Sequence, residues 1–190
     1  MPLFFVLLLL AGMPSHAEKV SNEQVIQTFE GYLDAIVKGN FDTLGQYIHP
    51  GELGTFKELF VTIGESAAKQ DNFEELAGIL GVETLDELRM TPADELFTNL
   101  FSFITIAMPE FRQILKSAKT TMLGQVTEGE GENALIHLVY RIEFEMNGAE
   151  IQSLDTATVK KAADGKYYLL FGEEIQGLII ALKNQFGGVN

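Results

Sequence analysis

The chain has 190 residues, and its 27 acidic side chains against 13 basic ones give a formal net charge of −14. Nucleic-acid binding requires a basic surface stripe, so this balance disfavours a nucleic-acid partner and indicates an acidic, solvated surface. Cysteine is absent, which excludes disulfides, a thiol nucleophile and a lipid-modified cysteine. The hydrophobic core alone must therefore hold the fold together.

The N-terminal segment predicts a secretory signal peptide, with the one departure that no Lys or Arg precedes its apolar run. Residues 1–17 contain no Asp, Glu, Lys or Arg, the run from Leu3 to Leu10 is apolar throughout, and Ser15-His16-Ala17 offers small residues to a signal peptidase. A transmembrane anchor is the weaker alternative, because the apolar run is shorter than the roughly 20 residues that span a bilayer. We therefore expect cleavage before Glu18, export to the periplasm or the extracellular medium without a stable membrane anchor, and one domain over residues 18–190.

Apolar residues recur at helical spacing from Ser21 to about Ala118. Ser21, with Gln24 three places on, predicts the start of a first amphipathic helix, and Gly39-Asn40 predicts its end. Further helices are predicted over residues 41–48, 51–69, 73–80 and 85–88, from Thr91-Pro92 onward, and again from Pro109. The helix after Pro92 has apolar side chains on more than one face, so we expect it to be buried or to line an apolar cavity.

From Thr120 the apolar period changes to two, which predicts strands. Four are expected in an antiparallel meander, over residues 120–127, 134–146, 149–162 and 166–171. Asn147-Gly148 is a strong signal for a two-residue hairpin turn, and the register that follows places Tyr140 opposite Asp155. The final stretch, residues 173–186, has one apolar face and predicts a helix packed against the sheet. The predicted fold class is α+β, with N-terminal helices, a C-terminal four-stranded antiparallel meander and a C-terminal helix.

Residues 29–44, with the sequence FEGYLDAIVKGNFDTL, and the following His49-Pro50 resemble the opening of nuclear transport factor 2-like domains. In that superfamily a long first helix with an aromatic stripe ends in a glycine-polar-phenylalanine step, and a short second helix follows. The resemblance implies a cone: a strongly curved sheet wrapped around the first helices, with an apolar pocket on its concave side. Tyr32, from the stripe, and Phe101 are then expected among the pocket residues.

The resemblance covers about half of the chain after residue 17, and the rest departs from it. The helical stretch from residue 51 to residue 118 is longer than the family's usual connection, and the strand that normally precedes the third helix has no predicted counterpart. The superfamily includes isomerases, dehydratases, hydrolases, transport factors and many exported proteins, so the resemblance implies no single activity.

Asp155 is the sharpest candidate for chemistry. It lies on an otherwise apolar sheet face, where an ionised carboxylate is costly unless a donor pairs with it, and such groups serve as general acids or bases. Tyr140 is its cross-strand neighbour, and ketosteroid isomerase, a known example from the superfamily resembled here, uses a tyrosine beside a protonated aspartate as an oxyanion hole. The alternatives are a structural Tyr-Asp hydrogen bond or an aspartate near the open edge of the sheet.

Other polar groups have both structural and functional interpretations. His49 either bonds the last carbonyls of the second helix or lies at the pocket mouth. His137, Arg141 and Glu143 share the wetter sheet face, where they form either solvated cross-strand ion pairs or a surface for a partner. The acidic loop 128–133 lacks an ordered calcium-binding pattern, and no histidine pair has metal-ligand spacing, so we expect no metal site and no cofactor.

Three functions remain open from the sequence. The first is an exported, non-catalytic domain that binds a small apolar or amphipathic molecule, with Tyr140, Asp155 and His49 as polar contacts. The second is a lyase- or isomerase-type enzyme in which Asp155 moves a proton. The third is a module that dimerises or binds a protein partner through the sheet face of His137, Arg141 and Glu143.

Overall fold

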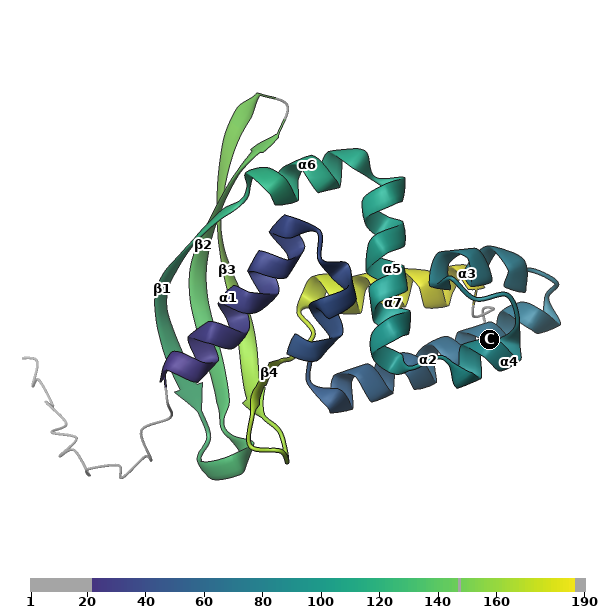
Figure 1. The fold of residues 1–190 in the computed structure, drawn as a ribbon, viewed down its shortest axis with the longest axis horizontal. Helices are drawn as coiled ribbons and strands as arrows, with labels where there is room; N and C mark the ends of the chain where they lie inside the picture. The colour runs from purple at the N-terminus through teal and green to yellow at the C-terminus, as the bar shows by residue number, and fades with distance from the viewer. Residues whose placement is uncertain (1–21, 147, 187–190) are drawn as a thin grey trace, which may run out of the picture.

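The fold is α+β, with helices first, then a four-stranded antiparallel sheet and a C-terminal helix (Figure 1). The computed structural model describes residues 22–146 and 148–186, so the predicted signal peptide, residues 1–17, lies outside the described residues. The helices are α1 (Asn22–Lys38), η1 (Phe41–Tyr47), α2 (Pro50–Lys69), α3 (Phe73–Leu80), α4 (Leu85–Met90), α5 (Ala93–Ala107), α6 (Pro109–Ser117), η2 (Gly131–Asn133) and α7 (Glu173–Phe186). The strands are β1 (Lys119–Glu128), β2 (Leu135–Met146), β3 (Ala149–Lys161) and β4 (Tyr167–Leu169).

Local signals account for most helix boundaries. Gly39 and Gly81 adopt positive φ just after α1 and α3, as the predicted helix ends require. Thr84 caps α4 by accepting a hydrogen bond from the backbone N–H of Glu87 at 3.1 Å. The prediction at Thr91-Pro92 was wrong by one position: Pro92 is the N-cap of α5, and the Thr91 hydroxyl donates backward to the Glu87 carbonyl at 2.8 Å. Thr91 therefore completes α4 instead of capping α5.

The sheet has the order β1-β2-β3-β4 with antiparallel neighbours throughout. The hairpin register is confirmed, since Met146 pairs with Ala149 and Tyr140 with Asp155. A β-bulge between Met122 and Gly124 shifts the register of β1 on β2, which the sequence did not indicate. Strand β4 is shorter than predicted, because only Tyr167–Leu169 pair with β3 before the chain turns toward α7.

The core joins the sheet to a helical layer beside it. Helix α1 crosses one face of the sheet (Figure 1), and the rings of Phe29 and Tyr140 lie 4.8 Å apart between them. Within the helical layer, aromatic rings from α2, α5 and the segment before α7 pack together, with centroids 5.7 Å apart for Phe56 and Phe97 and 5.5 Å apart for Phe97 and Phe171. The expectation that α7 packs against the sheet was wrong: α7 lies against α2, where its Leu182 and Phe186 are buried. An apolar helix face does not itself specify which layer will cover it.

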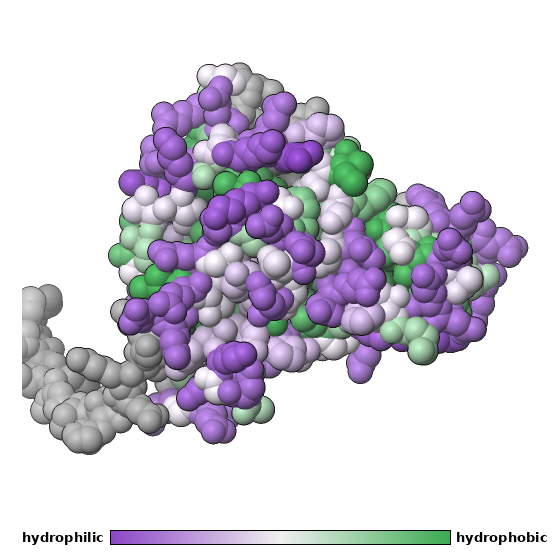
Figure 2. Space-filling view, viewed as in Figure 1, coloured by the Kyte–Doolittle hydropathy of each residue, from purple (hydrophilic) through white to green (hydrophobic). Residues whose placement is uncertain are grey.

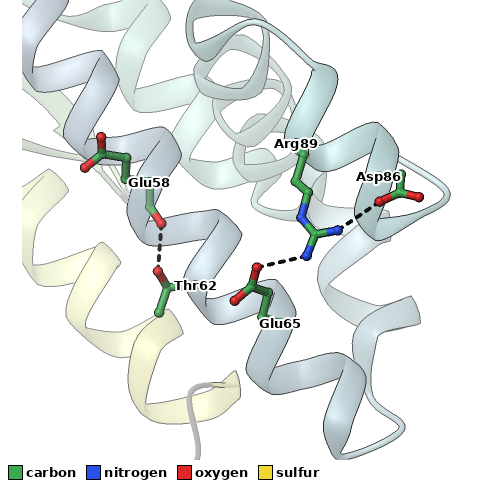
Figure 3. Close-up of polar contacts among 5 residues, drawn as sticks. All are labelled: Glu58, Thr62, Glu65, Asp86 and Arg89. Atoms are coloured by element: carbon green, nitrogen blue, oxygen red, sulfur yellow. Dashed lines mark hydrogen bonds and ion pairs between the residues drawn. The ribbon is translucent and has the colours of Figure 1, made fainter.

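A polar link on the surface joins α4 to α2 (Figure 3). The Arg89 guanidinium donates hydrogen bonds to Glu65 and to Asp86, both at 2.9 Å. These two bonds, the one to Glu65 first, raise the pKa of Arg89 above its ordinary value. Helix α2 also carries a hydrogen bond from the Thr62 hydroxyl to the Glu58 carbonyl, at 2.9 Å.

No helix within the described part of the chain is both long enough and apolar enough to span a membrane.

A glycine lets η1 approach α5. A β-carbon built at Gly45 would lie 2.5 Å from the Cβ and 3.0 Å from the Cα of Asp94, at the start of α5. Such contacts cannot be relieved by rotating a side chain, because one of the atoms is backbone. Residue 45 must therefore be glycine for η1 and α5 to pack as they do.

We expect Gly45→Ala to lower the free energy of unfolding by about 1–3 kcal/mol, the usual cost of overpacking. Gly54→Ala is the matched control, because a β-carbon at Gly54, on the exposed face of α2, meets no atom within 4 Å. That change should stabilise the protein by up to about 1 kcal/mol through helix propensity. Urea denaturation measures both, and equal effects of the two substitutions would contradict the close approach.

Candidate functional site

A groove of about 830 Å³ lies where α1, η1, the start of α2, the start of α5 and β4 meet. Its walls combine tyrosine rings and aliphatic side chains with amides, a hydroxyl and two oppositely charged groups. The lining residues are Gln24, Gln27, Thr28, Gly45, Gln46, Tyr47, Ile48, Pro50, Leu53, Ala93, Asp94, Lys166, Tyr167 and Tyr168. The volume is in the range of small-molecule sites, and the lining is about equally polar and apolar, which makes it more polar than the usual site of that kind.

Two hydrogen bonds fix the floor of the groove to the sheet. The Thr28 hydroxyl of α1 shares its proton between the Tyr167 carbonyl at 3.1 Å and the Gln24 carbonyl of its own helix at 3.0 Å, and the His49 backbone N–H donates to the Leu169 carbonyl at 2.8 Å. Ile48 also forms an isolated parallel bridge with Leu169. Strand β4 is therefore held along its outer edge as well as by β3.

The turn before β4 is held by one carboxylate. Asp164 accepts a hydrogen bond from the Lys166 backbone N–H at 3.0 Å and another from the Tyr168 hydroxyl at 2.7 Å, while Gly165 supplies the positive φ of the turn. The bond from Tyr168, and next the one from Lys166, lower the pKa of the Asp164 carboxyl, and the same carboxylate raises the pKa of Tyr168. The two lining residues Lys166 and Tyr168 are thus positioned by Asp164.

His49 caps a helix, but not the one predicted. Its Nδ1 accepts a hydrogen bond from the Gly51 backbone N–H at 3.1 Å, so the ring caps the N-terminus of α2 instead of bonding the carbonyls of the preceding helix. Nδ1 acts as the acceptor, and in the neutral ring Nε2 then carries the proton. The ring also lies edge-on to Tyr168, with centroids 6.2 Å apart, which places His49 beside the groove.

The other two aromatic candidates fall at different depths. Tyr32 is partly buried and lies edge-on to Tyr47 of the groove wall, with ring centroids 6.4 Å apart. Phe101 is only 6% exposed, and its ring lies 5.5 Å from that of Phe41 in the core between η1 and α5. Tyr32 is therefore one residue away from the groove, whereas Phe101 belongs to the packed interior.

Tyr140 and Asp155 do face each other, as the register predicted. The Tyr140 hydroxyl donates to one carboxylate oxygen of Asp155 at 3.0 Å, and the backbone N–H of Thr156 donates to the other at 2.7 Å. From Asp155 toward the hairpin turn, no strand among the described residues pairs with the outer side of β3, because β4 pairs only with Val159–Lys161. Asp155 thus satisfies two donors on an open stretch of sheet edge, and this arrangement favours the structural interpretation of the pair.

The structure does not bring Asp155 and His49 together. His49 contacts β4 at Leu169, which pairs with Val159, and Asp155 lies four residues farther along β3. At about 3.3 Å per residue, roughly 13 Å of strand separates the two. A mechanism in which both touch one small substrate is therefore not supported by the geometry.

The opposite sheet face is the wetter one, as predicted. His137 lies between Thr158 Oγ1 at 3.0 Å and Glu128 Oε2 at 3.1 Å, and Arg141 Nε forms an ion pair with Glu143 at 3.1 Å. These are contacts within one sheet. Within residues 22–146 and 148–186, no cluster of three or more His, Asp or Glu side chains could hold a metal ion.

Most groove residues were missed by the sequence analysis. Gln24, Gln46 and Lys166 come from three distant segments, and neither helical nor strand periodicity brings such segments together. The Asp164-Gly165 turn, followed by two tyrosines, was the one local signal available. It predicted a turn but not the neighbouring helix that makes the turn one wall of a groove.

No known protein family, curated protein or solved structure matches the chain. The resemblance to nuclear transport factor 2-like domains therefore stays a prediction, and the site must be interpreted from its own geometry.

We expect Tyr168→Phe to lower the urea midpoint between about pH 5 and pH 9, with the difference vanishing at both extremes. The Asp164 contribution is present above its ordinary pKa of 3.8 and is lost as the pH falls through its lowered folded-state pKa. The Tyr168 contribution is present below 10.0 and is lost as the pH rises through its raised value. Tyr167→Phe is the control, and a pH-independent difference for Tyr168→Phe would contradict the pairing.

We expect Asp155→Ala to lower the free energy of unfolding by about 1–2 kcal/mol, because the Tyr140 hydroxyl and the Thr156 N–H lose their acceptor. Ser153→Ala, an exposed position two residues earlier on the same strand face, should change it by less than about 0.5 kcal/mol. Chemical denaturation compares the variants. Full stability of Asp155→Ala would count against the structural role and return weight to acid-base chemistry.

Proposed function

We propose that the chain is a non-catalytic binding domain that accepts a small amphipathic molecule in the groove between α1, η1 and β4. The observation that carries this proposal is the groove itself, of about 830 Å³, with apolar and polar lining groups in one concavity. The polar contacts are those of the groove, in place of the Tyr140 and Asp155 expected from the sequence. Export, supported by the signal-like residues 1–17, would place the domain outside the cytoplasm.

The apolar part of the lining suits a hydrocarbon or ring. Ile48 and Leu53 are buried aliphatic side chains at the base, and the partly buried rings of Tyr47 and Tyr167 lie alongside. Tyrosine offers a broad apolar face while its hydroxyl stays hydrated at the rim. A ligand with one apolar portion can therefore displace water from this surface at little cost.

The polar part of the lining suits a hydrated head group. Gln24, Gln27 and Gln46 are exposed, and each amide offers both donors and an acceptor. Asp94 and Lys166 add one charge of each sign, on separate elements of the rim. Because exposed charges contribute little to affinity, we assign them a role in orienting the ligand.

The frame around the groove is fixed before any ligand arrives. The Thr28 and His49 hydrogen bonds hold β4, Asp164 holds the turn, and the close contact at Gly45 holds η1 against α5. Preorganisation of this kind reduces the entropy lost on binding. No comparable arrangement supports turnover, because the Asp155 carboxylate is already bonded to Tyr140 and Thr156.

A single tryptophan can report on the groove, because the chain contains none. We would introduce Gln46→Trp on the exposed side of the groove and Met90→Trp, at a position 82% exposed on α4, as the matched control. The probe is n-octyl glucoside, titrated below its micelle-forming concentration. We expect a saturable emission change for Gln46→Trp and none for Met90→Trp.

Native mass spectrometry of the unsubstituted chain, purified without refolding, provides the second measurement. A non-covalent adduct that is lost on denaturation would support binding and give the ligand's mass. Identical, non-saturable responses of the two tryptophan variants, together with a bare native mass, would overturn the proposal.

A further inference from the structure

Strand β1 is a long, free sheet edge. Its ten residues, Lys119–Glu128, pair with β2 on one side, and among the described residues no strand pairs with them on the other. Figure 1 shows β1 at the margin of the sheet that lies away from α2–α5 and α7. The β4 edge, by contrast, is closed by Thr28 and His49. An unpaired edge of this length is a ready template for another strand.

The register determines which backbone groups of β1 point outward. The hydrogen bond from the Leu170 N–H to the Thr158 carbonyl shows that even-numbered residues of β3 point away from β2. By the β2–β3 register, even-numbered residues of β2 then bond to β3 and odd-numbered ones bond to β1. On β1, the outward-pointing residues are then Thr120 and Met122 before the bulge, and Gln125 and Thr127 after it.

These outward groups are complementary to their own copy. If two β1 strands pair antiparallel about a two-fold axis between Leu123 and Gly124, Thr120 faces Thr127 of the second copy and Met122 faces Gln125. Thr120–Thr127 and Met122–Gln125 are then both hydrogen-bonded pairs between the copies. This is possible because the bulge at the centre of each β1 shifts the alternation of inward- and outward-pointing backbone groups by one residue. A pairing centred on Val126 would use only Gln125 and Thr127, so the register about the bulge satisfies the most groups.

Charge is complementary in the same register. Lys119 lies opposite Glu128 of the second copy, and the two-fold axis repeats this pair at the other end of the strand. The side chain of Lys119 forms no hydrogen bond or ion pair with any other described residue, whereas the Glu128 carboxylate accepts from His137 at 3.1 Å. Opposite charges directly across a sheet are stabilising, and like charges there are destabilising.

The β1 edge also carries apolar side chains that are exposed to solvent. Leu123 is 51% exposed and Val126 is 59% exposed, and Figure 2 shows hydrophobic side chains along this margin of the molecule. Thr121 and Val126 lie on the same face of the sheet, the face of Arg141 and His137. With the two-fold axis between Leu123 and Gly124, Thr121 of one copy lies directly opposite Val126 of the other. A second strand would cover part of both exposed side chains.

We propose that a second copy of this chain docks along β1, edge to edge, to form one continuous eight-stranded antiparallel sheet about a two-fold axis. This interface is isologous and closed, so it gives dimers and not fibres. It differs from the association through the sheet face of His137, Arg141 and Glu143 that the sequence suggested. It is also independent of the groove, which lies at β4 on the opposite edge.

Cysteine cross-linking tests the register directly, because the chain has no cysteine of its own. Thr121 and Val126 of the second copy form a non-hydrogen-bonded pair in the proposed sheet, with Cα atoms about 4.5 Å apart, within disulfide range. Copies of the same residue lie about 17 Å apart. Mixing Thr121→Cys with Val126→Cys under mild oxidation should therefore yield a disulfide-linked dimer, whereas each variant alone should yield little.

Sedimentation of the cysteine-free chain supplies the affinity. We expect a concentration-dependent dimer whose dissociation constant rises about tenfold or more in Lys119→Glu, because two ion pairs become two like-charge pairs. The double change Lys119→Glu with Glu128→Lys should restore most of the affinity. Leu154→Lys is the control, at a residue 68% exposed on the same sheet face but on β3, and it should leave the dimer intact.

Three results would overturn the proposal. One is a strict monomer with no cross-link in the mixture, and another is equal cross-linking in the mixture and in each variant alone, which indicates random encounter or another register. The third is dissociation by Leu154→Lys without an effect of Lys119→Glu, which would assign association to the sheet face. A cross-link confined to the mixture, with affinity restored by the charge exchange, would establish the edge.

Discussion

The groove depends on how the short edge strand β4 is held. Three paired residues make a weak strand, yet both carbonyls that point away from β3 are occupied, one by the Thr28 hydroxyl and one by the His49 N–H. These bonds join the last strand to the first helix and to the start of α2. Because backbone groups at a sheet edge must find partners, the same two bonds both end the sheet and create the concavity beside it.

Local chemistry made much of the fold predictable. The Asn147-Gly148 signal predicted the pairing of Tyr140 with Asp155, and glycines at positive φ marked the ends of α1 and α3. What could not be predicted depends on distant segments. The apolar face of α7 was evident, but its partner, α2, was not, and the groove unites residues from five elements. Periodicity identifies a buried face and carries no information about which surface buries it.

Asp155 shows how position within a sheet decides the role of a polar residue. Alternation correctly placed it on the apolar face beside Tyr140, and that placement alone suggested acid-base chemistry. The decisive fact is the length of β4, which leaves Asp155 on an unpaired stretch where its second oxygen accepts from the Thr156 N–H. By the alternation along β3, the Thr156 N–H points away from β2, toward the side where a further strand would pair. The Asp155 carboxylate accepts a hydrogen bond from this N–H, which is therefore no longer available to such a strand.

The three stretches of sheet edge, which are β4, the unpaired outer side of β3 and β1, thus differ in which groups bond to their outward-pointing backbone. Hydrogen bonds from α1 and the start of α2 occupy β4, and a carboxylate occupies an outward N–H of β3 near its middle. A bulge interrupts β1, and bulges commonly protect an edge by breaking its alternation against a regular strand. A second copy of β1 carries the same bulge at the same place. When the two copies pair about the two-fold axis, the two bulges lie opposite each other, so the hydrogen-bonding alternation of the two strands still matches. Such an edge excludes most partners while remaining open to its own copy.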